Sequence, residues 1–230
     1  MARPLLRDRV DLGLETRTKI GAVVLLIAGG GIVALIAALS RARAAAQVYL
    51  PAQAPASIQP YTVNLPASPF AWLTPEVYAS AKKWATARGL PLQWVLATIQ
   101  VESSGKQRAH ASTATEDSYG YMQLNWGSTA IRSLAESYGV TTPDRLMDPD
   151  TNIMLGTLVL RTYLDNVLKW LGGAPPPAPL DQIVRLAYKG PALVKSALAA
   201  GKTDPSTFYK NAGQAVDNWN VAMTKASAVA

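Results

Sequence analysis

Residues 92–105 read as a short apolar helix that ends in a single carboxylic acid, Glu102. Apolar residues recur here at the three- and four-residue spacing of a helix, and Pro91 before the stretch suits a helix start. The serines at 103 and 104 and Gly105 are typical of a helix end. We therefore predict a mostly buried helix of about three turns that ends near Glu102.

Glu102 would then occupy a position that disfavours negative charge. Apolar neighbours withhold solvation from a carboxylate, and the carbonyl end of a helix is the negative pole of its dipole. Both effects favour the protonated carboxyl group, the form with which a glycosidase protonates a leaving-group oxygen. Glu102 is therefore the candidate catalytic acid. The alternative is a side chain that merely extends from the last turn into solvent.

Composition excludes several other chemistries. The chain of 230 residues has no cysteine, which rules out disulfides, cysteine nucleophiles and cysteine-based zinc sites. The single histidine, His110, lies in a polar segment without a recognisable nucleophile motif, so a Ser-His-Asp mechanism is not expected. We expect neither a metal nor a cofactor.

An uncharged apolar run over residues 20–39 is long enough to cross a bilayer, because a helix of that length spans the ~30 Å hydrocarbon core. We predict a transmembrane helix over residues 20–40. Five basic residues precede the run and only two closely follow it, so residues 1–19 are expected in the cytoplasm. The alternative is a signal peptide cleaved after the alanines at 44–46, but the apolar run exceeds the usual ~7 to 15 residues of a signal core.

Beyond the predicted anchor, five prolines lie among small and polar residues over residues 47–70. We predict a semi-extended linker over residues 41–70 and a folded domain over residues 71–230. No stretch alternates as a strand does, so the predicted fold class is all or nearly all α-helical. Besides the helix that ends at Glu102, start and stop signals predict helices over residues 74–89, 128–138, 148–172, 180–189, 191–200 and 205–225.

Four short blocks of this domain, taken in order, resemble the soluble lytic transglycosylase and goose-type lysozyme superfamily of peptidoglycan-cleaving enzymes. They are Glu102-Ser103-Ser104, Gly120-Tyr121-Met122-Gln123, Asp148-Pro149 with Asn152-Ile153 and Gly156, and Ala187-Tyr188-Lys189-Gly190-Pro191.

The resemblance implies a lysozyme-like helical domain, peptidoglycan glycan strands as the substrate, and Glu102 as general acid and then general base. Asn152 and Gly156 belong to a structural signature and are assigned no chemistry. For Met122 and Tyr188 the alternative is an ordinary core position at a helix junction. The resemblance also places six residues at the substrate. Ser103 would support Glu102, and Tyr188 would hydrogen-bond near it. Tyr121, Met122 and Gln123 would form part of the sugar-binding wall, and Lys189 would lie beside them.

Two residues depart from the family's pattern. Tyr121 stands in place of the usual leucine, which changes the wall only modestly. Lys189 stands in place of asparagine, and a lysine only donates hydrogen bonds and adds a positive charge that favours ionised Glu102. Lys189 must therefore point to solvent, pair with another acid, or restrict the site to a narrower pH range.

The leading prediction is a membrane-anchored lytic transglycosylase that cleaves the β-1,4 bond between N-acetylmuramic acid and N-acetylglucosamine and forms a 1,6-anhydromuramic acid end. The first alternative is an inverting hydrolase, which needs a second carboxylate ~6.5 to 9.5 Å from the acid; Glu116 and Asp117 are the candidates. The second is a non-catalytic protein that binds the wall.

The location of the domain follows from the predicted anchor. The lipid bilayer would hold the chain through residues 20–40, with the domain on the periplasmic or wall side of a bacterial inner membrane, or in the membrane of a phage virion. The formal net charge of +7 falls mostly in the anchor segment, and the rest is too diffuse to indicate nucleic acid as a partner.

Overall fold

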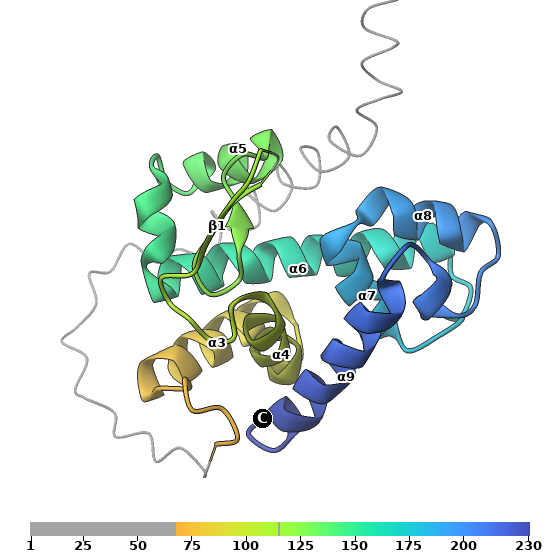
Figure 1. Ribbon diagram of the computed structural model, residues 1–230, viewed down its shortest axis with the longest axis horizontal. Coiled ribbons are helices and arrows are strands. Elements are labelled where there is room, and N and C mark those ends of the chain that lie inside the picture. The colour runs from red at the N-terminus through yellow and green to blue at the C-terminus, as the bar shows by residue number, and fades with distance from the viewer. Residues whose placement is uncertain (1–67, 115) are drawn as a thin grey trace, which may run out of the picture. The chain divides into compact units, whose positions relative to one another are not determined.

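The computed structural model describes residues 68–114 and 116–230, which belong to a unit that spans Pro51–Ala230 (Figure 1). This part contains seven α-helices, two short 3-10 helices and three short strands, in agreement with a mostly helical, lysozyme-like domain. The predicted anchor over residues 20–40, the alternative cleavage site and most of the predicted linker lie outside the described residues. Within those residues, no helix combines the length and the apolar character needed to cross a bilayer.

Helix α6 (Pro149–Leu171) runs through the middle of the domain and contacts α3, α7 and α8 (Figure 1). Its start follows from the sequence, because the Asp148 side chain accepts a hydrogen bond of 2.9 Å from the Thr151 backbone N–H and Pro149 occupies the first turn. It ends at Gly172, whose φ of 59° is left-handed. The predicted helix over residues 148–172 is confirmed.

Helix α3 (Pro75–Arg88) is capped by Thr74 and by Gly89, as its sequence predicts. It is fixed to the first turn of α6 by Asp150, whose carboxylate accepts from Ser80 Oγ at 2.7 Å, Trp84 Nε1 at 2.8 Å and Lys83 Nζ at 3.1 Å. Burial raises the pKa of Asp150, but these three hydrogen bonds together outweigh it and leave the pKa below its ordinary value.

Helix α4 (Leu92–Ser103) carries the apolar face that the sequence predicts. Buried side chains of this helix belong to the hydrophobic core, and α4 packs along α9 (Ala212–Ser227), the last helix. The fully buried side chains contributed by these two helices include Val95, Leu96, Ile99, Trp219 and Ala226. The prediction of a mostly buried helix is confirmed.

A small antiparallel sheet is the part of this mostly helical domain that the sequence did not predict. Its strands are β1 (His110–Ser112), β2 (Asp117–Tyr119) and β3 (Leu124–Asn125), in the order β1-β2-β3. No strand exceeds three residues and most of their side chains are polar, so the alternation by which a strand is recognised has no room to appear. The sheet and α5 (Thr129–Ser137) lie toward the N-terminal end of α6 (Figure 1).

The C-terminal part forms α7 (Leu180–Lys189) and α8 (Pro191–Ala199) as the sequence predicts. The single helix predicted over residues 205–225 is wrong, because a short 3-10 helix, η2 (Pro205–Thr207), precedes α9. Asn211 separates the two with a left-handed φ of 67°, a conformation that Asn tolerates and that interrupts a helix. A further 3-10 helix, η1 (Pro143–Met147), leads into α6.

Candidate active site

Glu102 is the second-last residue of α4, and its side chain is 2% exposed. The helix ends directly after it, because Ser104 and Gly105 take left-handed φ angles of 53° and 72°. A Cβ at position 105 would overlap the Trp72 ring, so only glycine fits there. The carboxylate is therefore held inside the domain, and the alternative in which it extends into solvent is excluded.

Both oxygens of Glu102 are paired with cations from α7. Arg185 Nη1 donates to Oε1, and Lys189 Nζ donates to Oε2 at 2.6 Å. The two cations lie four residues apart, so they stand on the same face of α7. Arg185 is 6% exposed in its side chain, whereas Lys189 is 45% exposed. The three groups carry one more positive than negative charge.

The ion pairs change the electrostatic expectation for Glu102. The sequence suggested apolar surroundings for Glu102, whereas the structure places two cations next to its carboxylate. Lys189 neither points away into solvent nor pairs with another acid, since its partner is Glu102 itself. The first two possibilities for Lys189 are therefore wrong, and the third, a narrower pH range for the site, stays a prediction.

Arg185 is the site residue that the sequence reasoning missed. It lies in an apolar run whose other members, from Ile183 to Ala187, are fully buried. Its Nε is buried without a hydrogen-bond partner among the described residues, and its guanidinium carbon lies 5.9 Å from the centre of the Tyr188 ring. A lone arginine inside an apolar helix face, four residues before a lysine, was the available signal, because a buried cation needs an anion.

Asn152 in α6 holds the loop that the sequence places beside the substrate. Its fully buried amide accepts from the Met122 backbone N–H at 2.8 Å and donates to the Tyr119 and Leu146 carbonyls, both at 2.9 Å. Gly120, with a φ of 74°, allows the loop to approach this amide, which a Cβ would overlap. The structural signature noted in the sequence thus fixes residues 120–123 against α6.

Tyr188 links this loop to α7. Its hydroxyl donates to the Met122 carbonyl at 2.9 Å rather than to Glu102, while its ring meets Tyr163 edge-on at 5.9 Å. Burial first and then the nearby Glu102 charge hold the pKa of Tyr188 well above its ordinary value, so the hydroxyl stays a donor. Met122 itself is fully buried. It therefore occupies a core position, which was the alternative to a place in the sugar-binding wall.

The other predicted substrate residues, Tyr121, Gln123 and Ser103, each contact protein groups other than Glu102. Tyr121 is 5% exposed, and its ring centre lies 6.4 Å from that of Trp72. Gln123 Nε2 donates to the Ala109 and Gly120 carbonyls at 3.1 and 2.9 Å. Ser103 Oγ donates to the Ile99 carbonyl at 3.1 Å, so its hydroxyl supports the end of α4 and not the Glu102 carboxylate.

The candidate second carboxylates are engaged within the small sheet. Asp117 Oδ1 lies 2.9 Å from His110 Nε2, and Oδ2 accepts from the Tyr119 hydroxyl at 3.2 Å. The hydrogen bond with His110 lowers the pKa of Asp117 below its ordinary value. Glu116 accepts from Ser118 Oγ at 2.8 Å. Their partners thus come from the sheet, and those of Glu102 come from α7.

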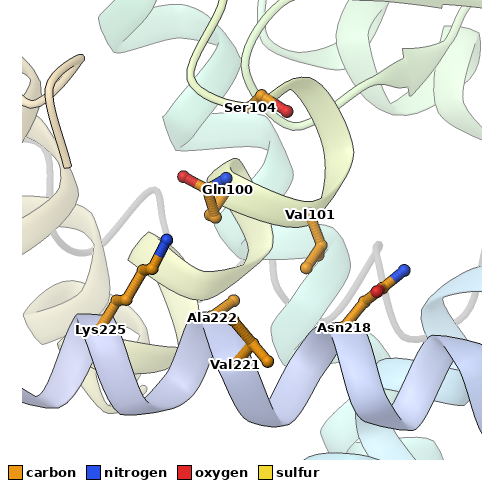
Figure 2. Close-up of a pocket in the computed structure, with 7 residues that line it drawn as sticks. All are labelled: Gln100, Val101, Ser104, Asn218, Val221, Ala222 and Lys225. Atoms are coloured by element: carbon orange, nitrogen blue, oxygen red, sulfur yellow. The ribbon is translucent and has the colours of Figure 1, made fainter. Parts of the chain in front are cut away.

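A hollow of about 280 Å³ lies between α4 and α9 (Figure 2). Gln100 and Val101 line it from α4, Ser104 lines it from the position directly after α4, and Lys225 extends toward it from α9 (Figure 2). Glu102 and its two cations are not among its lining residues. Throughout residues 68–114 and 116–230, no cluster of three or more His, Asp or Glu side chains is placed to hold a metal ion.

The region that contains Glu102 matches a known protein family. The family model described as Transglycosylase SLT domain matches residues 79–175, which confirms the resemblance to the lytic transglycosylase and lysozyme-like superfamily. The match contains Glu102, the loop over residues 120–123 and the start of α6, and it ends before Arg185 and Lys189. It supports peptidoglycan transglycosylase-type activity in general. A search of curated proteins found no match to the chain.

Proposed function

We propose that this chain is a lytic transglycosylase that cleaves the β-1,4 bond between N-acetylmuramic acid and N-acetylglucosamine without consuming water. The observation that carries the proposal is the buried Glu102 carboxylate at the end of α4, inside the region that matches the transglycosylase domain. A carboxylate enclosed by protein, rather than dissolved in solvent, is suited to proton transfer at a bound glycan.

In the first half of the reaction, protonated Glu102 transfers its proton to the glycosidic oxygen. The bond from that oxygen to C1 of the muramic acid breaks, and the N-acetylglucosamine part leaves with a new hydroxyl. The N-acetyl oxygen of the muramic acid stabilises the cation at C1. For Glu102 this half requires Oε2 to be free of Lys189, since Oε1 is held by the enclosed Arg185.

In the second half, ionised Glu102 accepts the proton of the muramic acid 6-hydroxyl as that oxygen bonds to C1. A 1,6-anhydro ring forms, and Glu102 regains the proton that it gave. Arg185, which keeps its contact with Oε1, suits this half because it supplies a positive charge next to the carboxylate between the two proton transfers. One carboxylate suffices for the whole cycle, since the attacking oxygen belongs to the substrate.

The hydrolase alternative gains no support from the candidate second carboxylates. An inverting enzyme needs a base with a free oxygen directed at a water near the acid. Both oxygens of Asp117 have partners in the sheet, and one oxygen of Glu116, Oε1, accepts from its neighbour Ser118. We therefore propose the transglycosylase outcome over the hydrolytic one.

A non-catalytic wall-binding protein is the second candidate, and one observation favours it. A carboxylate whose two oxygens are both paired with cations is also the arrangement of a purely structural ion cluster. In that case Glu102 would matter for stability alone.

We further propose that residues 20–40 anchor the chain in a bilayer with the N-terminus in the cytoplasm. The supporting observation is the uncharged apolar run with its excess of basic residues on the N-terminal side. Protease added to spheroplasts should digest the domain and spare the segment before residue 20. Digestion of that segment with protection of the domain would reverse the orientation.

Substitution of Glu102 tests the catalytic proposal. Glu102→Gln keeps the shape but removes the transferable proton, so cleavage of purified wall should fall by ~10² to 10⁴ or more. The matched control is Glu136→Gln at an exposed position of α5, which should cleave as wild type does.

Glu102→Gln also leaves Arg185 without its counter-charge, a change that costs ~3 to 5 kcal/mol at a buried ion pair. Thermal unfolding must therefore be measured for each variant. Glu102→Asp keeps the charge and shortens the side chain by one methylene, so it supplies a folded variant if Glu102→Gln unfolds. Cleavage at the wild-type level by a folded Glu102→Gln variant would show that Glu102 is not the catalytic acid, whereas a wild type that cleaves no wall would favour the non-catalytic candidate.

A further inference from the structure

The two cations on Glu102 differ in how far they can move. The Arg185 side chain is 6% exposed and lies on the buried face of α7, so its contact with Oε1 is fixed. The Lys189 side chain is 45% exposed and belongs to the last residue of α7, directly before Gly190. Oε2 is therefore the oxygen that can be freed, and Lys189 is the group that must leave it.

A substrate approaching Oε2 meets Lys189 first. A neutral glycan would have to separate the ammonium group from the carboxylate without offering it another anion. A glycan that carries a carboxylate near the bond to be cleaved can accept the ammonium group in exchange. In the exchange one ion pair replaces another, so its electrostatic cost is smaller than that of simple separation.

We propose that Lys189 is an anion subsite that releases Glu102 only when it transfers to a carboxylate of the substrate. The ligand class is a carboxylate of the peptide stem of peptidoglycan, or of the lactyl group where the stem is absent, and the subsite discriminates against the same glycan without charge. This proposal rests on the proposed function, because it assigns the substrate feature that the same site selects. Since the site carries one more positive than negative charge, it attracts an anion before the exchange begins.

Exchange of Lys189 between Glu102 and the substrate accounts for lysine at position 189, where the family usually has asparagine. Asparagine, the residue usual in the family, leaves the carboxylate without a mobile cation, and charge on the glycan then matters less. Lysine makes access to Oε2 depend on substrate charge. Lys189 acts through Glu102 and the substrate carboxylate, so it is a specificity-determining residue rather than a proton donor.

The first test compares purified peptidoglycan with the same material after its carboxylates have been converted to amides by carbodiimide coupling. The full chain in detergent is assayed at fixed ionic strength. Amidation should lower kcat/KM of the wild type by at least about fivefold, the size expected for a partly exposed ion pair. For Lys189→Asn the loss should be less than about twofold, and Lys189→Arg should keep the discrimination of the wild type.

Lys195→Asn is the matched control, because it removes one positive charge from an exposed position of α8. It should retain the sensitivity of the wild type to amidation. An equal loss in Lys189→Asn and in the wild type would overturn the proposal, since the sensitivity would then come from the overall charge of the protein.

A binding measurement separates this proposal from the catalytic one. In a Glu102→Gln background, where cleavage is expected to be at least ~10²-fold slower, Lys189 has lost its carboxylate partner and is free for the wall. Co-sedimentation with untreated wall should be at least about fivefold tighter for Glu102→Gln than for the double variant with Lys189→Asn. With amidated wall the two should bind equally.

The outcomes of the two tests are distinct. If the wild type cleaves no wall but the binding difference is present, the transglycosylase proposal fails and the anion subsite stands. If the wild type cleaves both substrates equally well and the binding difference is absent, the subsite fails and the catalytic proposal is unaffected.

Discussion

Replacement of Asn152 tests how the site is supported, because this one amide fixes the loop beside α7. Asn152→Ala removes an acceptor from the Met122 backbone N–H and a donor from two carbonyls. Each buried polar group left without a partner costs ~1 to 3 kcal/mol. Since part of this cost is relieved by relaxation of the loop, we expect a loss of about 3 to 5 kcal/mol in the free energy of unfolding.

Such a loss is a large fraction of the stability of an ordinary domain, which is ~5 to 15 kcal/mol. For a domain of this size it corresponds to a decrease of roughly 10 to 15 °C in the melting temperature. Thermal unfolding followed by circular dichroism measures it. The matched control is Asn218→Ala at an exposed position of α9, which should change stability by less than about 0.5 kcal/mol.

Asn152→Asp sharpens the test, because it changes the hydrogen-bonding character with little change in volume. At neutral pH the buried aspartate places an acceptor opposite two carbonyl oxygens, and its pKa in the folded state would be raised above the unfolded value of ~3.9. The folded variant then binds a proton more strongly than the unfolded chain, so its stability deficit should shrink as the pH falls from 7 toward 4. A deficit below about 1 kcal/mol in Asn152→Ala, or a pH-independent deficit in Asn152→Asp, would refute the role assigned to this amide.

Three further predictions concern other parts of the domain. Asp150→Ala should cost about 1 to 2 kcal/mol of unfolding free energy in urea titrations, because three donors of α3 lose a half-exposed carboxylate. The folded pKa of this carboxyl group is lowered, so its contribution should be present above the unfolded pKa of ~3.9 and lost as the pH falls through the folded value. Gly156→Ala should cost ~1 to 3 kcal/mol by thermal unfolding, since the added Cβ would overlap Met122. Glu116→Gln and Asp117→Asn should each retain wall-cleaving activity in a turbidity assay, and loss of cleavage in either would favour the hydrolase.

The helices and their ends were predictable from the sequence because the signals that set them are local. Thr74 with Pro75 and Asp148 with Pro149 start α3 and α6, and Gly89 ends α3 where the sequence indicates. The position of Glu102 at the end of an apolar helix followed from the same kind of signal. Each depends on residues within one or two turns, so no tertiary information is needed.

The features that the sequence did not reveal depend on pairing between distant segments. The partners of Glu102 are separated from it by more than 80 positions along the chain, and no local pattern specifies such a pairing. Arg185 looked like an isolated charge on an apolar face until the fold brought it to a carboxylate. The small sheet escaped recognition because its strands are too short for periodicity.

The central claim is that Glu102 cleaves the glycan without water, and the mass of the released products tests it most directly. Purified peptidoglycan is digested with the full chain in water enriched in ¹⁸O, and the muramic acid ends are analysed by mass spectrometry. A transglycosylase predicts 1,6-anhydromuramic acid ends, lighter than a hydrolysed end by one water and free of ¹⁸O, and no product from a folded Glu102→Gln variant. Reducing ends that carry ¹⁸O would contradict the claim and assign the chain to hydrolysis.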